Sequence, residues 1–352
     1  MSAQRPTHNL LVTGGSGFIG SAFIRWLFAQ PSYSGKIVNL DLLTYAANPD
    51  NVSQVPADRY TFVHGDILDG KLVEETCRAH GVDTVVHFAA ESHVDRSIHG
   101  PGVFMHTNIL GTYRLLEVVR ALPGVHFHHV STDEVYGSLG PQGYFTETTP
   151  YQPNSPYSAS KAASDHLVRA YAHTYGVSVT ISNCSNNYGP YQFPEKLIPL
   201  MIMNLLEGKP LPIYGDGSNV RDWLYVDDHA EAIWLILQQA KSGETFNVGG
   251  NAEWPNLQLV HKLMDVVAEL TGRSREALQK QITFVADRPG HDRRYAIDCS
   301  KLQSQLGWTQ RENIDSGLRK TVRWYLDNPL WLERVRSGAY REWIDRNYGK
   351  RQ

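Results

Sequence analysis

Apolar runs alternate with helical patterns through the first half of the chain. Strands are predicted at residues 9–13, 36–41, 60–64, 83–88, 126–130 and 177–181, several of them apolar at almost every position. Between them, apolar side chains at a spacing of about 3.6 residues predict helices over residues 18–28, 71–80, 107–121 and 159–175. Alternating strands and amphipathic helices form βαβ units, so we expect an α/β fold with a Rossmann-type, doubly wound parallel sheet. Strands without polar positions are typical of a sheet covered on both faces.

The pattern changes after about residue 190. Helices are predicted over residues 197–207, 226–239, 256–271 and 314–327, but Pro- and Gly-rich loops interrupt them and strands no longer alternate regularly with helices. We therefore expect an NAD-binding Rossmann domain over residues 1–190 and a smaller, mixed α/β C-terminal substrate domain over residues 191–352. The boundary is soft, and the chain is free to cross back between the two domains.

The bulk composition fits a globular protein and excludes several classes of function. The 352 residues carry a formal net charge of −3, and no cluster of Lys and Arg stands out. Nucleic acid binding needs a basic face, so we expect no nucleic acid partner. No apolar run approaches membrane-spanning length, and the polar N-terminal segment lacks the apolar core of a signal peptide. Cys77, Cys184 and Cys299 form no CxxC pair, which argues against a disulfide framework or a zinc site. We expect a cytoplasmic protein without a membrane partner.

A glycine-rich turn follows the first predicted strand and opens the first predicted helix. Gly14, Gly17 and Gly20 follow one another at intervals of three residues. This spacing allows a tight turn, close approach of the backbone to a pyrophosphate and close packing of the helix on the strand. The helix N-terminus then offers free N–H groups to the phosphates. Such a turn can also simply connect two elements, but a strand before it and a helix after it favour dinucleotide binding.

Asp41 strengthens this interpretation. It lies about 20 residues after the last glycine, at the end of the second predicted strand, where a carboxylate binds the adenosine ribose hydroxyls. A carboxylate repels a 2′-phosphate, and neither Leu42 nor Leu43 supplies a cation, so NAD is favoured over NADP. Asp66 follows the third predicted strand, within reach of the adenine. Considered alone, Asp41 would be a turn residue and Asp66 a helix cap.

Tyr157 and Lys161 are four residues apart and share one face of a predicted helix. A lysine cation beside a phenol favours the phenolate, and bound NAD⁺ adds positive charge. The tyrosine can then take a proton from a sugar hydroxyl while a hydride leaves for the nicotinamide. This spacing is common by chance, and a buried Tyr beside a surface Lys is the alternative. Ser131 and Thr132, at the end of the fifth predicted strand, favour the catalytic interpretation.

Together, the glycine turn, Ser131-Thr132 and the Tyr157–Lys161 pair resemble the extended short-chain dehydrogenase/reductase family. That family includes epimerases, dehydratases and decarboxylases of nucleotide sugars. The resemblance covers nearly the whole chain and is most specific at residues 131–137 (STDEVYG), which are similar to the signature of the 4,6-dehydratases that act on dTDP-glucose. Further matching stretches are residues 89–97, 183–191, 215–223 and 287–292.

The resemblance implies a reaction with tightly bound NAD. Oxidation at C4 of dTDP-glucose makes C5–H acidic, water is lost across C5 and C6, and the same hydride returns to C6, which gives dTDP-4-keto-6-deoxyglucose. Glu134 is implied as the C5 base, Asp133 as the C6 acid and Tyr157 as the C4 base. Thr132 is implied to orient the C4 hydroxyl, and Lys161 to tune Tyr157 and hold the nicotinamide ribose.

Asp133 must be protonated when it acts. We therefore expect burial and the neighbouring Glu134 to raise its pKa. A solvated turn is the alternative for an isolated Asp-Glu pair. Its place directly after Ser-Thr, at the carboxyl end of a strand where such folds bind ligands, argues for the catalytic interpretation.

The resemblance also implies which residues bind cofactor and substrate. Those implied to bind NAD are Gly14, Gly17, Phe18, Ile19, Gly20, Asp41, Leu42, Thr44, Asp66, Ile67, Ala89, Ala90, Ser92, Thr107, Tyr157, Lys161 and Asn187. Those implied to bind the dTDP-sugar are Ser92, Thr132, Asn186, Lys196, Leu197, Pro212, Tyr214, Arg221, Asn256, Arg288 and His291. The arginines suit the diphosphate because a guanidinium fork binds two oxygens at once. A surface salt bridge is the alternative for each cation.

Two positions depart from the family's pattern. Leu42 stands where a Lys often follows the ribose-binding Asp, and Ala47 stands where a Gly is usual. These departures affect packing around the adenosine and leave the catalytic residues unchanged.

His126, His128 and His129 raise the question of a metal. At the fifth predicted strand they alternate faces, so only His126 and His128 share one, and no carboxylate or Cys completes a set. We expect a structural role for these histidines and no metal.

The helices predicted over residues 107–121 and 159–175 carry apolar faces. In this family the two helices form a four-helix homodimer interface, and the resemblance implies the same here. A purely intramolecular core is the alternative.

Other functions remain as alternatives. The nearest is a related NDP-sugar enzyme: a UDP-glucose dehydratase, a UDP-hexose 4-epimerase or a UDP-glucuronate decarboxylase. An epimerase needs no acid–base pair after Ser-Thr, and a decarboxylase needs no acid at C6, so Asp133 and Glu134 favour a dehydratase. A non-catalytic NAD-sensing regulator has no reason to retain these residues. Thymine and uracil differ by one methyl group, so the sequence does not identify the base.

Overall fold

The computed structural model describes Arg5 and residues 7–337. Most of the polar N-terminal segment on which the expectation of no signal peptide rests lies outside the described residues, as does the end of the predicted substrate domain. Within the described part, no helix is both long enough and apolar enough to cross a membrane.

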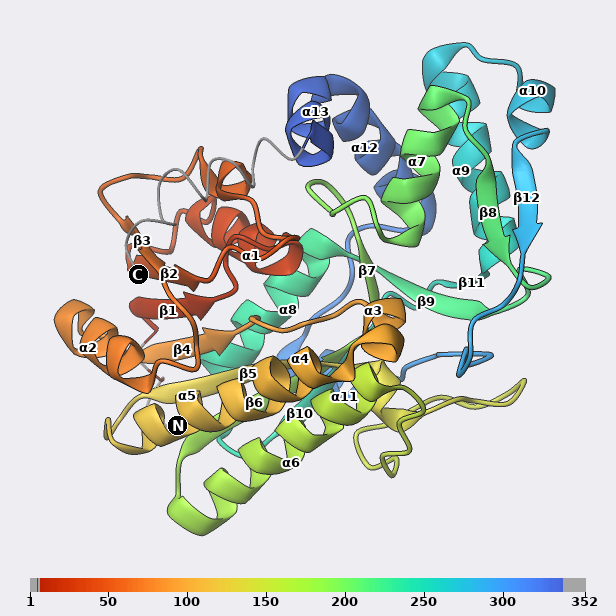
Figure 1. Cartoon of the computed structure of the whole chain (residues 1–352). Coiled ribbons are helices and arrows are strands. Elements are labelled where there is room, and N and C mark those ends of the chain that lie inside the picture. Colours follow the sequence, from red (N-terminus) through yellow and green to blue (C-terminus); the bar gives the residue numbers. More distant parts are fainter. Residues whose placement is uncertain (1–4, 6, 338–352) are drawn as a thin grey trace.

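Seven strands form the central sheet, in the order β10-β6-β5-β4-β1-β2-β3 (Figure 1). In chain order they are β1 (Asn9–Thr13), β2 (Lys36–Asp41), β3 (Tyr60–His64), β4 (Thr84–His87), β5 (His126–Thr132), β6 (Ser178–Cys184) and β10 (Thr245–Val248). Every pairing in this sheet is parallel. The strand order reverses between β1 and β4, and this reversal opens a crevice at their carboxyl ends, where doubly wound folds bind ligands. The expected α/β, Rossmann-type fold is confirmed.

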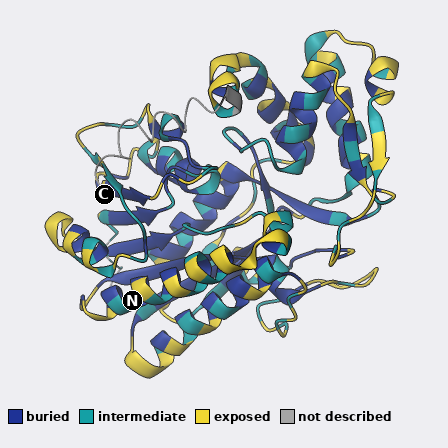
Figure 2. Cartoon of the chain, viewed as in Figure 1, coloured by how far each residue is buried: buried dark blue, intermediate teal, exposed yellow. Residues whose placement is uncertain are grey.

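Helices cover both faces of the central sheet. On one face, α2 (Gly70–His80), α5 (Thr112–Arg120) and α6 (Pro156–Tyr175) pack on the side chains of Leu11, Phe127 and Val179. On the other face, α1 (Phe18–Phe28) and α8 (Val226–Gln239) pack on Leu10 and Val12. Figure 2 shows the strands buried and the exposed residues on the outer sides of the helices. Burial on both faces explains why several of the strands, such as β1, are apolar at almost every position.

The chain crosses back into the central sheet after residue 190. α8 covers the sheet next to α1, and β10 extends it by pairing with Ile181–Cys184 of β6. A single division after residue 190 therefore does not describe the chain path. Phe246 and Val248 of β10 are fully buried with residues of α8 and α11 (Ser300–Leu306), which ties this returning segment to the larger unit.

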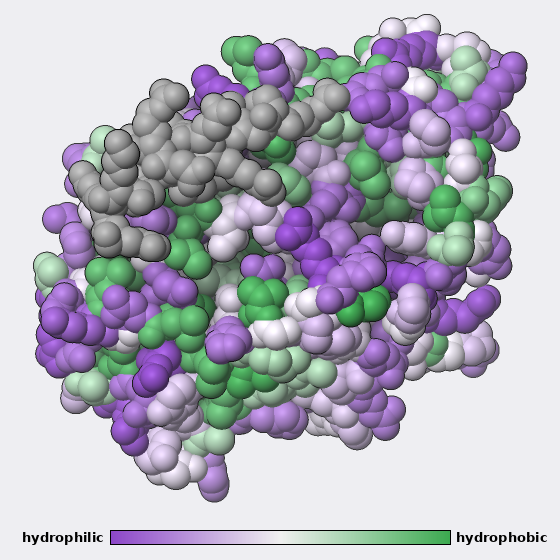
Figure 3. Space-filling model, in the orientation of Figure 1, coloured by the Kyte–Doolittle hydropathy of each residue, from purple (hydrophilic) through white to green (hydrophobic). Residues whose placement is uncertain are grey.

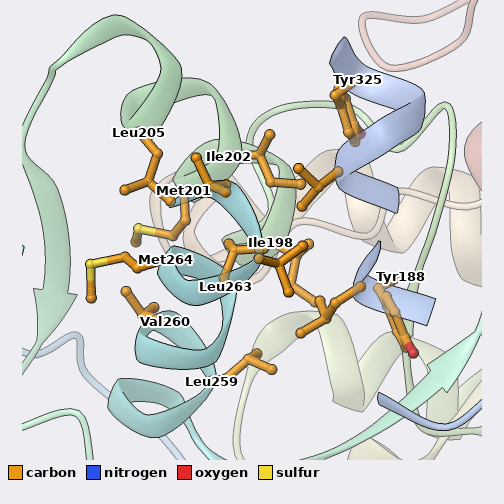
Figure 4. Close-up of a cluster of buried hydrophobic side chains, with 14 of the residues drawn as sticks. Tyr188, Ile198, Met201, Ile202, Leu205, Leu259, Val260, Leu263, Met264 and Tyr325 are labelled. Atoms are coloured by element: carbon orange, nitrogen blue, oxygen red, sulfur yellow. The ribbon is translucent and has the colours of Figure 1, made fainter. Parts of the chain in front are cut away.

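The smaller unit is built on two short sheets. β7 (Asn186–Tyr188), β9 (Val220–Tyr225) and β11 (Glu253–Pro255) form one, in the order β11-β9-β7, while β8 (Leu211–Tyr214) pairs in parallel with β12 (Ile282–Val285). Three helices enclose its core: α7 (Leu197–Glu207), α9 (Asn256–Thr271) and α12 (Ile314–Asp327). In Figure 4, the side chains of Met201 and Ile202 on α7 lie toward those of Leu263 and Met264 on α9. The shorter helices are η1 (Pro49–Val52), α3 (Val94–His99), α4 (Pro101–Phe104), η3 (Asp133–Tyr136), α10 (Arg275–Gln279) and α13 (Pro329–Ser337).

Long, strongly periodic helices have the predicted bounds, whereas the helix predicted over residues 107–121 is different. α1, α7, α8, α9 and α12 begin and end at the predicted residues. At 107–121, a π-helical turn (Met105–Gly111) precedes a shorter α5. The turn buries Asn108, whose amide oxygen accepts from the Glu91 backbone N–H at 2.9 Å and whose amide nitrogen donates to the Ser160 hydroxyl at 2.8 Å. The irregular turn thus links the loop after β4 to α6.

We expect Ile202→Ala to lower the free energy of unfolding by about 2–5 kcal/mol, because Ile202 is fully buried in the core of the smaller unit. The matched control is Leu330→Ala, since Leu330 is 68% exposed and its truncation should change stability by less than about 0.5 kcal/mol. Urea denaturation of both variants measures the difference. Equal effects would contradict the packing described for α7.

Candidate active site

A cavity of about 310 Å³ lies at the carboxyl ends of the central strands. Every residue predicted to bind the cofactor lines it, and so do the five predicted catalytic residues. Four predicted substrate residues also line it: Ser92, Thr132, Asn186 and Lys196. The other seven lie outside its wall, in the smaller unit or the loops that join it: Leu197, Pro212, Tyr214, Arg221, Asn256, Arg288 and His291.

The three glycines of the first turn serve two purposes. A Cβ on Gly14, whose φ is +72°, would lie 2.6 Å from the Ala89 backbone nitrogen, and one on Gly20 would lie 2.4 Å from the Gly14 carbonyl oxygen. These two positions allow tight packing. A Cβ on Gly17 would meet nothing closer than the Gly14 oxygen at 3.3 Å, and Gly17 lines the cavity. The missing side chain of Gly17 leaves space beside the first turn of α1, whose N–H groups have no helical partners. This space fits the phosphates of a dinucleotide.

Asp41 lies in the cavity wall at the end of β2. Its carboxylate accepts from the backbone N–H of Ser16 at 2.9 Å and of Leu43 at 2.8 Å, and this ties the glycine turn to the end of β2. Burial raises the pKa of Asp41, and the two N–H donors oppose that shift. Leu42 beside it is 44% exposed on the cavity rim, and Ala47 is buried. This wall therefore carries a carboxylate and no cation from residues 42 and 43.

Thr132 ends β5 and caps the turn that carries the acid–base pair. Its hydroxyl oxygen accepts from the Glu134 backbone N–H at 3.3 Å, which fixes the N-terminus of η3. The Thr132 hydroxyl also donates to Asp133 Oδ1 at 3.4 Å. The cap holds both carboxyl side chains at the cavity wall, one residue apart.

Burial raises the pKa of both carboxyls, but the neighbouring charges differ between the two. Asp133 is 1% exposed, and burial raises its pKa well above the usual value, with Glu134 and Asp222 adding to the rise. Burial also raises the pKa of Glu134, but the cations of Arg221, Arg288 and Lys196 oppose that rise. The surroundings of Asp133 therefore favour its neutral form, while Glu134 faces positive charge that favours its anion. The predicted rise in the pKa of Asp133 is confirmed.

Tyr157 and Lys161 lie in the first turns of α6, which Ser155 caps. Burial raises the pKa of Tyr157 well above its ordinary value, Glu134 adds to the rise, and a hydrogen bond with Thr132 opposes it. Lys161 donates to the Val130 carbonyl at 2.8 Å, and burial lowers its pKa to about 8. The expectation that Lys161, together with the positive charge of bound NAD⁺, favours the phenolate of Tyr157 stays a prediction.

The substrate side of the site is rich in cations that are already oriented. Lys196 donates to the Ser92 carbonyl at 2.8 Å, Arg288 donates to Asp95 at 2.9 Å, and Arg221 lies over the Tyr295 ring at 4.2 Å. All three charges act on Glu134, although Arg221 and Arg288 do not line the cavity. They are therefore held where the cavity meets the smaller unit.

The asparagines predicted at the site differ in the hydrogen bonds that their side-chain amides make within the chain. The buried side-chain oxygens of Asn186 and Asn256 have no hydrogen-bond partner among the described residues, which suits groups that face a ligand. Asn187 instead donates to the Ser185 carbonyl at 2.9 Å, and its oxygen pairs with His229 Nδ1 at 2.9 Å. Both ends of its amide are thus used within the chain, while Asn187 still lines the cavity, and its contact with the cofactor stays a prediction.

The chain is similar to several known proteins. The family model described as GDP-mannose 4,6 dehydratase matches residues 11–321. The dTDP-glucose 4,6-dehydratase of Salmonella typhimurium is 52% identical, over 97% of this chain and 99% of its own length. The crystal structure of DesIV, a dTDP-glucose 4,6-dehydratase from Streptomyces venezuelae with NAD and TYD bound, is 49% identical, with a TM-score of 0.88 over 93% of this chain and 100% of that one.

The chain belongs to the dTDP-glucose 4,6-dehydratase family.

The fold alone would not separate this family from others. The UDP-glucose 4-epimerase of Thermotoga maritima has a TM-score of 0.81 over 91% of this chain and 99% of its own, at 29% identity. What favours a dehydratase over an epimerase is the acid–base pair of Asp133 and Glu134 on one turn.

Sequence reasoning missed several residues that line the site of this dehydratase-family protein. They include Glu91, Cys184, Ser185, Gln192, Phe193 and Glu195. Each lies within a few residues of a predicted one, so the loops were identified correctly and the individual side chains were not. Reading whole loops, rather than motif positions, would have included them.

Two of the three buried histidines of β5, His126 and His128, lie among hydroxyl groups. His126 and His128 share a face and lie against Ser178, Thr180 and Ser182 of β6, at 2.9–3.1 Å. Over the described residues, no group of three His, Cys, Asp or Glu side chains could hold a metal ion. The two side chains thus bridge neighbouring strands.

Gly17→Ala should reduce the NAD retained by the purified protein with little loss of thermal stability, because its methyl group meets no protein atom closer than 3.3 Å. Gly14→Ala is the contrasting variant, and it should lower the melting temperature because its methyl group would overlap the backbone at Ala89. Cofactor content by absorbance and melting by calorimetry test the pair. Full NAD occupancy in Gly17→Ala would place the phosphates elsewhere.

Proposed function

We propose that this protein converts dTDP-glucose into dTDP-4-keto-6-deoxyglucose and water, with tightly bound NAD. The observation that carries this proposal is the pair Asp133 and Glu134, two carboxyls on one capped turn with opposite electrostatic surroundings. An elimination across C5 and C6 needs one group to take a proton and another to give one. The pair supplies both at neighbouring positions.

The residues that fit the cofactor are the glycine turn, Asp41 and Lys161. NAD⁺, when bound, accepts a hydride from C4, returns it to C6 and adds positive charge near Tyr157. Tyr157, as phenolate, takes the proton of the C4 hydroxyl, which Thr132 orients. Lys161 holds the nicotinamide ribose.

Elimination then uses the acid–base pair. Glu134 takes the C5 proton that the C4 ketone has made acidic. Asp133 gives its proton to the C6 hydroxyl, which departs as water. Glu134 finally returns a proton to C5. A buried Asp133 favours this division, since its pKa is raised and its Oδ2 has no partner among the described residues.

The diphosphate of the substrate would lie against the cations at the junction of the two units. Lys196, Arg221 and Arg288 supply three positive charges there, and Asn186 supplies an amide. The thymidine is assigned to the smaller unit, beside Tyr214 and His291, whose rings lie 6.1 Å apart. The relatives' substrate, dTDP-glucose, is the one we assign to this chain.

We further propose a homodimer through α5 and α6. These helices lie side by side on one face of the sheet, and Val103 (49% exposed), Leu110 (45%) and Tyr175 (52%) leave apolar surface uncovered on them and on the turns before α5. Figure 3 shows apolar patches over this ridge, in the lower part of the view. A second copy would cover them.

Three buried, unpaired cysteines suit a reducing, cytoplasmic compartment.

The substrate assignment is tested by incubating the protein with dTDP-glucose, UDP-glucose and UDP-galactose. We expect a 4-keto-6-deoxy product, seen by its absorbance in alkali, from dTDP-glucose. Turnover of UDP-glucose or UDP-galactose, without any product from dTDP-glucose, would overturn the assignment.

Asp133→Asn should still oxidise the sugar but release water at least about 100-fold more slowly, because an amide cannot give the C6 oxygen a proton. Reduced cofactor should then accumulate, visible as NADH absorbance. Tyr157→Phe is the contrasting variant, since it removes the C4 base and should prevent that absorbance. Loss of NADH formation in Asp133→Asn would show that the roles are divided differently.

The two halves of the reaction should respond to pH in opposite directions. Burial raises the pKa of Asp133, so the acid is lost, and dehydration slows, as pH rises through that raised value. Oxidation needs the Tyr157 phenolate and therefore gains with rising pH. In single turnovers the fraction of reduced cofactor should rise with pH. A fraction that falls instead would contradict the assignment of Asp133 as the acid.

A further inference from the structure

A buried polar network contacts Lys161 without lining the cavity. The Lys161 ammonium lies 3.4 Å from His129 Nε2, and the same ring nitrogen lies 3.2 Å from Asp165 Oδ1. His129 and Asp165 are both fully buried. Asp165 follows Lys161 by four residues on α6, which places the two on one helical face. The imidazole thus stands between a buried cation and a buried anion.

Asp165 is also connected to the end of β5. Its Oδ2 accepts from the Tyr151 hydroxyl at 2.8 Å and from the Asn183 amide nitrogen at 3.2 Å. The same Asn183 nitrogen lies 3.2 Å from the Thr132 carbonyl oxygen. One carboxylate therefore contacts both the group beside Lys161 and the strand end that carries Thr132.

A buried ammonium is costly unless an anion compensates it. Burial lowers the pKa of Lys161 to about 8, and Asp165 opposes that fall. Burial lowers the pKa of His129 to about 4, with Lys161 contributing, so the ring is neutral. Although burial alone would raise the pKa of Asp165, His129 and Lys161 lower it below its usual value.

Among the residues that the structure describes, Asp165 is the group near Lys161 that supplies a negative charge at neutral pH. The titratable neighbours are His129 on β5, Asp165 and Tyr157 on α6, Cys184 on β6 and His87 on β4. Burial raises the pKa of the Cys184 thiol to about 12 and that of Tyr157 well above its ordinary value, and it lowers the pKa of His87 well below its ordinary value. Arg169 adds a cation near His129 and Asp165. Asp165 is left as the compensating anion.

We propose that Asp165, across the neutral ring of His129, is a positioning residue that keeps Lys161 charged and held against Val130, one helical turn from Tyr157. This role rests on the proposed function, in which Lys161 tunes Tyr157 and holds the nicotinamide ribose. Neither Asp165 nor His129 touches the cavity, so they act only through Lys161 and the strand end.

Asp165→Asn tests this role, because it removes the charge and keeps the shape. Without the anion the pKa of Lys161 falls, so the ammonium is lost at a lower pH. The alkaline limb of kcat should move down by about one pH unit, which is about a fivefold loss near pH 8, about a tenfold loss at higher pH and little loss near pH 6. KM for dTDP-glucose should stay the same, since Asp165 does not contact the substrate.

A second readout does not depend on turnover. The pH at which the purified protein releases NAD should fall in Asp165→Asn, because Lys161 is proposed to hold the nicotinamide ribose. This measurement separates the two proposals. If wild type makes no product from dTDP-glucose, the function is wrong, yet the shift in NAD release still tests Asp165.

Three variants provide controls. Asp228→Asn removes another buried carboxylate, which accepts from the backbone of Arg311 and Glu312 on the far side of α8, so it should lower thermal stability without moving either pH profile. His129→Phe should move both profiles as Asp165→Asn does, and it decides the matter if Asp165→Asn does not fold. His129→Gln keeps a hydrogen-bond donor and an acceptor at this position, so both of its pH profiles should be close to those of the wild type. Unchanged profiles in Asp165→Asn or His129→Phe, with only lower stability, would overturn the proposal.

Discussion

The close approach of the first glycine turn to the loop after β4 is the constraint on which the site depends. Gly14 leaves no room for a side chain beside the backbone of Ala89, so the carboxyl ends of β1 and β4 stay in contact at the point where the strand order reverses. Each later strand of the parallel sheet then ends on the same edge. The crevice is thus fixed by backbone packing, and side chains from loops far apart in sequence meet along it.

Electrostatics divides the roles within that crevice. Asp133, Glu134, Tyr157 and Lys161 are all withdrawn from solvent, and withdrawal alone would make each of them neutral. What separates them is the partner each one faces. Glu134 faces three cations, Asp133 faces two carboxyls, and Lys161 faces Asp165 across a neutral imidazole. Several of these partners, namely Arg221, Arg288, Asp222 and Asp165, do not themselves line the cavity.

The sequence was most informative where a motif and an element coincide. Four predicted features line the cavity, because each follows a strand end or begins a helix. They are the glycine turn, Asp41, the turn after β5, and the pair Tyr157 and Lys161. The long amphipathic helices were predictable for the same reason. The return of β10 to the central sheet was not, since four residues carry no periodicity and the pairing with β6 is non-local.

The network behind Lys161 shows what a motif cannot reveal. His129 was interpreted as a structural histidine of a buried strand, and Asp165 was not singled out, because nothing in the sequence links residues 36 positions apart. Only the register of β5 against β6 and the packing of α6 bring the ring between the carboxylate and the ammonium. The tyrosine and lysine can be recognised from their spacing, but the charge state on which they depend is set by tertiary contacts. A protein with the same spacing and an apolar residue at 165 would keep the motif and leave its buried lysine without a compensating anion.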